Sequence, residues 1–348
     1  VSPQKRSVIA VALRRVRPHQ PISGADSMRA VHRTCARQLP FALWLLVFLA
    51  WPASPNAFGP ATILVLYDDL KATHSSIFEH FRAAILHHRE GGMPPRITGM
   101  ASGKLDIASL DSIRPDLIVT IGVSAAARLR QQARAVPQLN VFLPRAAYEQ
   151  LHNGDSRPPA ALFLDQPIER QMALARVLRP NARRVGMLRT EEPGNAPTEI
   201  DKLAHRFGFD LVVVTIEADG NAARAIKQVV ASSDLIIARF DREAYKPATT
   251  KWLLYLAFQQ RRPIVGFSSA LLDAGAVAVT FSTPEQIAAH TAELVRVWLD
   301  TGKAPSGSHY PRHYHVRLNG PVADALDVAP MDEAELAARM RDALAEPE

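Results

Sequence analysis

From residue 61 onward the chain alternates between short apolar runs and amphipathic segments of helical length, and this alternation restricts the possible folds most strongly. The runs are continuous and rich in valine and isoleucine, as in strands buried on both faces of a parallel sheet. Between them apolar residues recur at helical spacing, for example at Met172, Ala175 and Leu178. We therefore predict right-handed βαβ units in doubly wound parallel sheets. The predicted strands are 61–67, 116–121, 139–143, 160–164, 184–188, 211–216, 235–238, 263–266 and 276–281.

Eight or more strands are many for a single sheet of this kind, and the chain offers three places to pass between two sheets. The first is 165–167, where Pro167 can open a helix. The second is 282–285, with Ser282 or Thr283 as the helix cap. The third is 302–307, rich in Gly, Pro and Ser. We predict two α/β lobes joined by hinge crossovers. The N-terminal lobe would comprise 58–165 and 283–307, and the C-terminal lobe 166–282 and 308–348.

Residues 1–57 have the order of a leader that carries a signal peptide. Basic residues follow a start at Met28, an apolar run covers 39–50, and small and turn-forming residues continue to Ala57. The run is shorter than the ~20 residues that a permanent membrane helix needs. We predict secretion through the inner membrane into the periplasm, with cleavage after Ala57. An uncleaved N-terminal anchor is the alternative.

The net charge of +7 belongs to this leader, which holds eight of the 41 lysines and arginines and one of the 34 acids. Residues 58–348 are therefore formally neutral and lack the basic surface expected of a nucleic-acid binder, so we predict no nucleic-acid partner. The single cysteine, Cys35, also lies in the leader. We expect a mature chain without disulfides, Cys-ligated metals or a Cys nucleophile.

Several segments carry a resemblance to a known family. They are 165–167 with 183–188, 262–269 with 274–276, 282–287, and 310–319 with 322–326. In order and spacing these segments resemble the ABC-transporter substrate-binding proteins of the type I periplasmic binding fold, whose relatives take up aromatic amino acids. The resemblance covers most of 61–330. It implies a hinged protein that closes on a small ligand, although 122–124 and 68–71, two turns bordering the cleft, depart from the family's pattern.

Ligands of such sheets lie beyond the carboxyl ends of the strands, where helix N-termini present free N–H groups. Ser124 follows one predicted strand, so its hydroxyl and the N–H groups of Ser124 and Ala125 are candidates to hold a carboxylate. The alternative is that Ser124 only caps its helix. Asp68, at the end of the first strand, is a further candidate.

The second lobe offers candidates at corresponding strand ends. Ser268 and Ser269 provide hydroxyls, and Phe267 provides a ring that can stack on an aromatic ligand. Arg239 and Asp241 can grip the carboxylate and ammonium of an amino acid, or pair with each other as a hinge salt bridge.

The sequence contains little that indicates an enzyme or a metal protein. His313 and His315 lie two apart in a predicted strand, but no carboxylate or third histidine has matching spacing, so we predict no metal and no other cofactor. Gly-x-Ser-x-Gly, Walker and His-Glu-x-x-His motifs are absent. A hydrolase whose triad is assembled only in space is the remaining enzyme alternative.

These observations lead to one functional prediction. We expect a monomeric, non-enzymatic solute-binding component of an ABC-type uptake system, which closes on a small carboxylate such as an amino acid and meets a membrane permease. The alternative is a periplasmic ligand sensor or interaction module that signals to a membrane receptor and has no role in transport.

Overall fold

The computed structural model describes residues 60–68, 71–87, 93–132, 135–190, 197–217 and 222–345. The predicted signal peptide, the start at Met28, the cleavage after Ala57 and Cys35 all lie outside the described residues. Among the helices within these ranges, none is long and apolar enough to cross a membrane.

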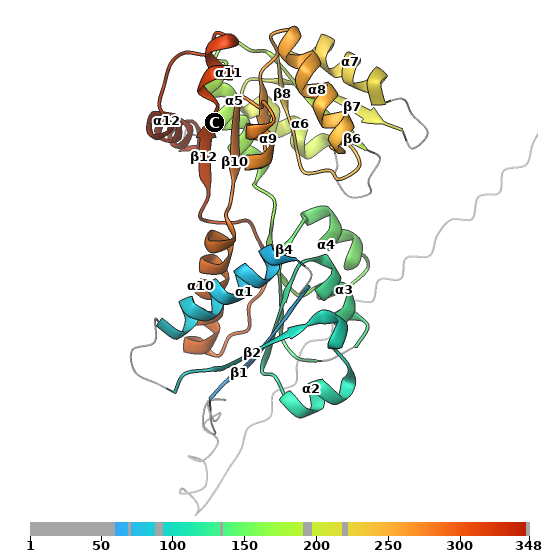
Figure 1. The fold of residues 1–348 in the computed structure, drawn as a ribbon, viewed down its shortest axis with the longest axis vertical. Helices are drawn as coiled ribbons and strands as arrows, with labels where there is room; N and C mark the ends of the chain where they lie inside the picture. The colour runs from blue at the N-terminus through green and yellow to red at the C-terminus, as the bar shows by residue number, and fades with distance from the viewer. Residues whose placement is uncertain are drawn as a thin grey trace, which may run out of the picture. The chain divides into compact units, whose positions relative to one another are not determined.

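The first lobe is built on a six-stranded, all-parallel sheet with the order β11-β5-β4-β3-β1-β2. Figure 1 shows it in blue to green, apart from the late strand β11. Its central strands are buried along their length, as their apolar sequences predict. The strands are β1 (Thr62–Tyr67), β2 (Arg96–Ala101), β3 (Leu117–Ile121), β4 (Gln138–Leu143), β5 (Ala160–Phe163) and β11 (Ser308–His309).

Helices cover both faces of this sheet because successive side chains of each strand point to opposite faces. Ile63 and Val65 pack with helices α1 (Ala72–His87) and α10 (Pro284–Thr301). Leu64 and Leu66 pack on the other side, with α2 (Ile107–Ile113) and α3 (Val123–Arg130), and α4 (Arg145–Leu151) continues that layer. A short 3-10 helix, η1 (Ser102–Lys104), precedes α2.

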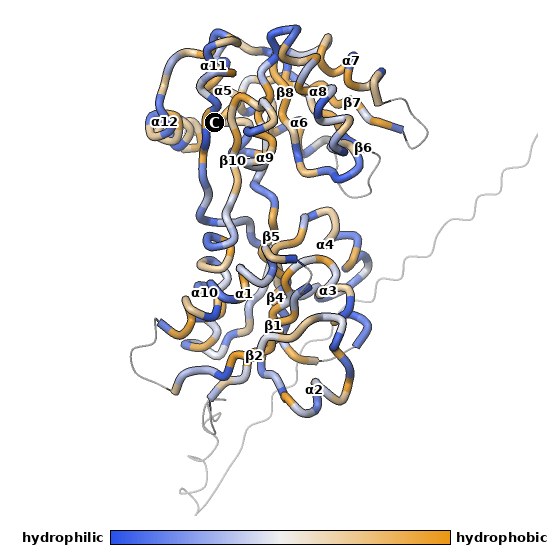
Figure 2. Tube along the Cα trace, viewed as in Figure 1, coloured by the Kyte–Doolittle hydropathy of each residue, from blue (hydrophilic) through white to orange (hydrophobic). Residues whose placement is uncertain are grey.

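The second lobe repeats this plan with the order β12-β10-β9-β8-β6-β7, in which only the edge strand β12 is antiparallel to its neighbour. The strands of both lobes are mostly hydrophobic (Figure 2). The prediction of two lobes with parallel sheets is confirmed. The strands are β6 (Arg184–Thr190), β7 (Asp210–Ile216), β8 (Leu235–Ile237), β9 (Ile264–Gly266), β10 (Ala278–Phe281) and β12 (His315–Leu318).

Two layers of helices also enclose the second sheet. On one face lie α5 (Ile168–Leu178), α6 (Pro197–Arg206), α11 (Gly320–Ala325) and α12 (Glu333–Ala345). On the other lie α7 (Ala222–Ser232), α8 (Pro247–Gln259) and α9 (Ser269–Asp273). The last of these is only five residues long, and this brevity becomes important below.

The chain passes between the sheets after β5, after β10 and after β11. The sequence analysis placed the third crossover in 302–307, and this position is wrong. The segment instead leads α10 back to the first sheet, where β11 pairs with β5 and the carbonyl of Gly307 accepts a hydrogen bond from Ala161 N at 3.0 Å. Two residues of pairing are too short to leave an apolar run in the sequence.

Hydrogen bonds tie the three crossovers together. Gln166, on the first, donates to Ser282 Oγ on the second at 2.9 Å, and Ser282 Oγ donates to the carbonyl of His313 on the third at 2.7 Å. Arg170 donates to Gln166 Oε1 at 2.6 Å and to the carbonyl of Pro311 at 2.8 Å. The second crossover is thus bonded directly to the other two, and Arg170 of α5 links the first to the third.

Candidate functional site

The carboxyl ends of the strands border a cavity of about 220 Å³. Both sheets reverse the direction of winding next to their first strand, between β1 and β3 and between β6 and β8, and open α/β sheets bind ligands beside such switch points. The cavity receives residues from both lobes and from the crossovers. Its lining comprises Thr73, Phe142, Leu164, Asp165, Gln166, Gln171, Arg239, Phe240, Phe267, Ser268, Ser269, Phe281, Ser282 and Pro284.

This lining contains one acid, Asp165, and one base, Arg239. Asp165 follows β5 of the first lobe, and its carboxylate accepts a hydrogen bond from the backbone N–H of Arg145. Arg239 follows β8 of the second lobe. Burial raises the pKa of Asp165, while the Arg145 N–H and the Arg239 charge act in the opposite direction. The cavity therefore has a carboxyl group on the wall from the first lobe and a guanidinium group on the wall from the second.

Four phenyl rings supply most of the apolar surface: Phe142, Phe240, Phe267 and Phe281. Phe142 has a backbone φ of 56°, where the register between β4 and β5 shifts. Such a conformation is unfavourable for a bulky residue, and residues strained in this way cluster at functional sites. The ring of Phe142 packs edge-on against His74, with centroids 5.6 Å apart.

A buried glutamine holds the strand ends of the second lobe in place. Gln171, 2% exposed near the start of α5, donates from Nε2 to the carbonyl of Ala238 at 2.6 Å and to that of Gly266 at 3.3 Å. These two carbonyls immediately precede Arg239 and Phe267. Gln171 thus fixes the backbone from which a charged and an aromatic lining residue project.

Four of the residues predicted from the sequence line this cavity: Arg239, Phe267, Ser268 and Ser269. Ser268 also has the capping role that was its alternative, because its hydroxyl accepts a hydrogen bond from Leu271 N at 3.2 Å.

Asp241 has a different position, in the turn that follows β8. Its Oδ2 accepts from the backbone N–H and the hydroxyl of Thr190 at 2.7 and 2.8 Å, and its Oδ1 accepts from Glu243 N and Ala244 N at 3.0 and 2.9 Å. Arg239 and Asp241, both described, form no ion pair with each other. The carboxylate of Asp241 therefore stabilises its own turn.

Ser124, Ala125 and Asp68 do not contribute to the cavity lining. Ser124 is exposed within α3, Ala125 is fully buried, and Asp68 pairs with Lys71 Nζ at 3.8 Å. The cap of α3 is Gly122, whose φ is 88°.

His74 explains why glycine occupies that cap. A Cβ added to Gly122 would lie 2.4 Å from Cε1 of His74. Burial lowers the pKa of His74, and its Nδ1 has no hydrogen-bond partner among the described residues.

The two histidines considered as metal ligands have other contacts. His313 Nε2 lies 2.9 Å from Glu293 Oε1, and the ring of His315 packs against Phe281 with centroids 5.7 Å apart. Across the described ranges, no group of three or more His, Cys, Asp or Glu residues is placed to hold a metal ion.

Comparison with family models places residues 104–319 in the family described as ABC transporter substrate binding protein. The chain belongs to this family. ABC transporter substrate-binding proteins are a non-enzymatic, solute-binding class that is normally periplasmic or extracellular and that interacts with permeases. A search of curated proteins finds no match.

Solved structures of substrate-binding proteins share the fold. A ligand-free, open substrate-binding protein with adhesive properties from Clostridium difficile is 15% identical, with a TM-score of 0.59 over 78% of this chain and 96% of that one. An ABC domain from Streptococcus pneumoniae in complex with L-Trp is 17% identical, with a TM-score of 0.54 over 80% and 98%. A conserved domain protein from Vibrio cholerae is 22% identical, with a TM-score of 0.51 over 81% and 98%.

Proposed function

We propose that this substrate-binding protein is exported to the periplasm by its leader and closes on an α-amino acid, preferably an aromatic one, for delivery to an ABC permease. The observation that carries the proposal is the pairing of Asp165 and Arg239 in one small cavity lined by four phenyl rings. An amino acid carries one ammonium, one carboxylate and, in the aromatic members, one ring. The cavity offers a counterpart for each.

The charges assign the two ends of the ligand. Arg239 is the counterpart of the ligand carboxylate, because a guanidinium forms bidentate hydrogen bonds with that group. Asp165 is the counterpart of the ammonium. It takes the role that the sequence analysis gave to Asp241, whose oxygens are occupied by Thr190, Glu243 and Ala244.

The position of the pair supports a closing mechanism. Asp165 is attached to the first lobe and Arg239 to the second, so a zwitterion that pairs with both stabilises the state in which the lobes are close. The lobes move about crossovers that Gln166, Ser282 and Arg170 bond to one another. Ligand binding thus selects one geometry of a preformed hinge.

The experiment is isothermal titration calorimetry with L-tryptophan and two analogues that each lack one charge. Tryptamine has no carboxylate, and indole-3-propionate has no ammonium. We expect each analogue to bind at least tenfold more weakly than L-tryptophan, since a buried charge in the site is left unpaired. The proposal is rejected if neither L-tryptophan nor any other zwitterionic amino acid binds.

Two variants test the assignment of the ends. Arg239→Gln should lower the affinity for L-tryptophan at least tenfold and leave tryptamine nearly unaffected, because tryptamine has no carboxylate to pair. Asp165→Asn should show the opposite preference, with indole-3-propionate least affected. Asp68→Asn is the control, since Asp68 lies outside the cavity lining. Equal losses for all three ligands in either variant would contradict the assignment.

A further inference from the structure

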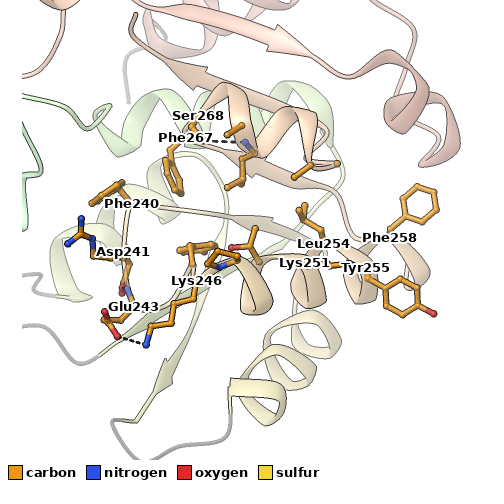
Figure 3. Close-up of a pocket in the computed structure, with 18 of the residues that line it drawn as sticks. Phe240, Asp241, Glu243, Lys246, Lys251, Leu254, Tyr255, Phe258, Phe267 and Ser268 are labelled. Carbon is orange, nitrogen blue, oxygen red and sulfur yellow. Dashed lines mark hydrogen bonds and ion pairs between the residues drawn. The ribbon is translucent and has the colours of Figure 1, made fainter. Parts of the chain in front are cut away.

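The second lobe has a larger, open groove of about 1130 Å³ next to the cleft cavity (Figure 3). It lies between α8 and α9, where the five-residue α9 covers less of the sheet than the thirteen-residue α8. Its sides are largely apolar and aromatic. Tyr255 and Phe258 stand at one end of the groove and are 56% and 44% exposed, while Phe240 and Phe267 stand at the other end.

One side chain borders three cavities in this part of the lobe. Phe240 lines the cleft cavity, the groove and a small cavity of about 30 Å³ beside β6. Phe267 and Ser268 line the cleft cavity and the groove but not the third space. Phe240 therefore lies where the three spaces meet.

We propose that Phe240 is the partition that limits the length of the ligand, by closing the cleft cavity off from the groove between α8 and α9. The proposal rests on the proposed function, because the ligand site is the same cavity. Once the partition is removed, the groove can take the far end of a longer ligand. That ligand is an α-amino acid whose side chain carries a second aromatic ring beyond the first. Its zwitterionic end stays between Asp165 and Arg239.

The surroundings of the two rings indicate which of them forms the movable part. Phe267 is held between Phe240 and Tyr245, with ring centroids 5.7 and 5.8 Å away. Phe240 is 38% exposed and contacts only Phe267 among the ring pairs of the described residues. The hydrogen bonds of the neighbouring Asp241 turn fix the backbone of Phe240, so movement at this position is confined to the phenyl side chain.

The apolar part of the groove matches an uncharged aromatic extension, while the charged residues Asp241, Arg242, Glu243, Lys246 and Lys251 line the rest. Lys246, at its side, is already paired with Glu243 at 2.6 Å, as Figure 3 shows. Leu254 and Leu271 contribute apolar surface, and Tyr255 and Phe258 offer ring faces and edges. A second ring placed here is covered by apolar side chains and adds no charge that would need a partner.

The test compares L-tyrosine with O-benzyl-L-tyrosine, which differ by one apolar ring at the far end, in calorimetric titrations of full-length variants. In Phe240→Ala we expect the affinity ratio of O-benzyl-L-tyrosine to L-tyrosine to rise at least tenfold over the ratio in the unchanged protein. Phe281→Ala is the matched control, because Phe281 lines the cleft cavity but not the groove. It should weaken both ligands without raising the ratio.

A second substitution places the extension in the groove. Tyr255 lines the groove and not the cleft cavity, so adding Tyr255→Ala to Phe240→Ala should reduce the gain for O-benzyl-L-tyrosine and leave L-tyrosine unchanged. Phe240→Leu, which keeps an apolar side chain, replaces Phe240→Ala if circular dichroism shows that the alanine variant does not fold.

The outcomes separate the two proposals. If neither the unchanged protein nor the Phe240→Ala variant binds an amino acid, the proposed function fails, and the partition fails with it. The partition is overturned if opening position 240 leaves the ratio unchanged, or if Phe281→Ala raises it as much.

Discussion

The two lobes share a strand order but fill the same part of their helix layer in different ways. In the first lobe a chain of buried polar side chains lies by α3 and α4. Thr120 donates to Asn140 Oδ1 at 2.6 Å, Asn140 Nδ2 lies 3.2 Å from His152 Nε2, and His152 Nδ1 lies 2.8 Å from Asp155 Oδ2. In the second lobe the corresponding helices, α8 and α9, border the open groove. This layer is bonded by directional hydrogen bonds in the first lobe and leaves an open groove in the second.

The difference teaches that the sheet order does not determine what each lobe can do. The segment after β4 forms the seven-residue α4 and continues to His152 and Asp155, which close the layer. The segment after β9 forms only the five-residue α9 before the chain enters β10. A few residues of connection therefore decide whether a doubly wound lobe has a sealed side or an open one.

The largest expected effect on stability comes from shortening a leucine to alanine, once in the closed core of the first lobe and once beside the groove of the second. Leu139 in β4 is fully buried, whereas Leu254 in α8 is 8% exposed and lines the groove. We expect Leu139→Ala to lower the free energy of unfolding by about 4 kcal/mol and Leu254→Ala by only about 2 kcal/mol, because only the first leaves a closed cavity. Urea unfolding curves measure both. Equal losses would show that the groove is not open in solution.

A second pair of variants tests the hydrogen-bond chain. Thr120 in β3 and Thr280 in β10 are both fully buried, but the hydroxyl of Thr280 has no partner among the described residues. Thr120→Val should cost about 1–3 kcal/mol, because Asn140 loses its donor. Thr280→Val should be neutral or slightly stabilising, because a hydroxyl without a partner is replaced by a methyl group. Thermal unfolding measures the stability of both variants. A comparable loss of stability in both would contradict the expected difference between Thr120 and Thr280.

The sequence predicted the regular strands of the sheets better than the edge strands and the connections between them. Continuous valine- and isoleucine-rich runs identified the central strands, because burial on both faces leaves a pattern that any parallel sheet shares. The edge strand β2 was missed, because its exposed and half-buried residues, Arg96–Ala101, leave no such run. The helix-opening prolines Pro167 and Pro284 identified the crossovers at 165–167 and 282–285. The third crossover also contains a proline, Pro311, but the two-residue strand before it leaves no apolar run that would mark it.

The cavity residues divide in the same way. Arg239, Phe267, Ser268 and Ser269 could be proposed because each stands just beyond a recognisable strand. Phe142 could not, because its outward turn depends on a register shift between two strands, which no local pattern encodes. Asp165 lay in a recognised motif, but its proposed role depends on Arg239, which comes from the other lobe.

A helix of the first lobe buries a titratable histidine. His290 on α10 is 4% exposed and accepts a hydrogen bond at Nδ1 from the backbone N–H of Arg312 on the third crossover at 3.2 Å. Burial lowers its pKa to about 4, helped by the charges of Arg312, His309 and His313 and opposed by Glu293. Helix α12 of the second lobe buries only the apolar residues Leu336 and Met340. Acid should therefore weaken the first lobe before the second.

Lowering the pH from 7 to 5 tests this difference in acid sensitivity between the lobes, which has the smallest expected effect. His290 takes up a proton near pH 6.5 in the unfolded chain but only near pH 4 in the folded chain. The contribution of neutral His290 to the free energy of unfolding is therefore fully present above pH 6.5 and is lost as the pH falls from 6.5 to about 4. After solvent screening we expect a loss of roughly 1–2 kcal/mol that His290→Asn abolishes, because asparagine keeps an acceptor and does not titrate. His205→Asn, at an exposed histidine of the second lobe, should leave the loss intact. Hydrogen exchange at pH 5 should accelerate in α10 and not in α12, and equal acceleration in the two helices would assign the acid sensitivity to the whole chain.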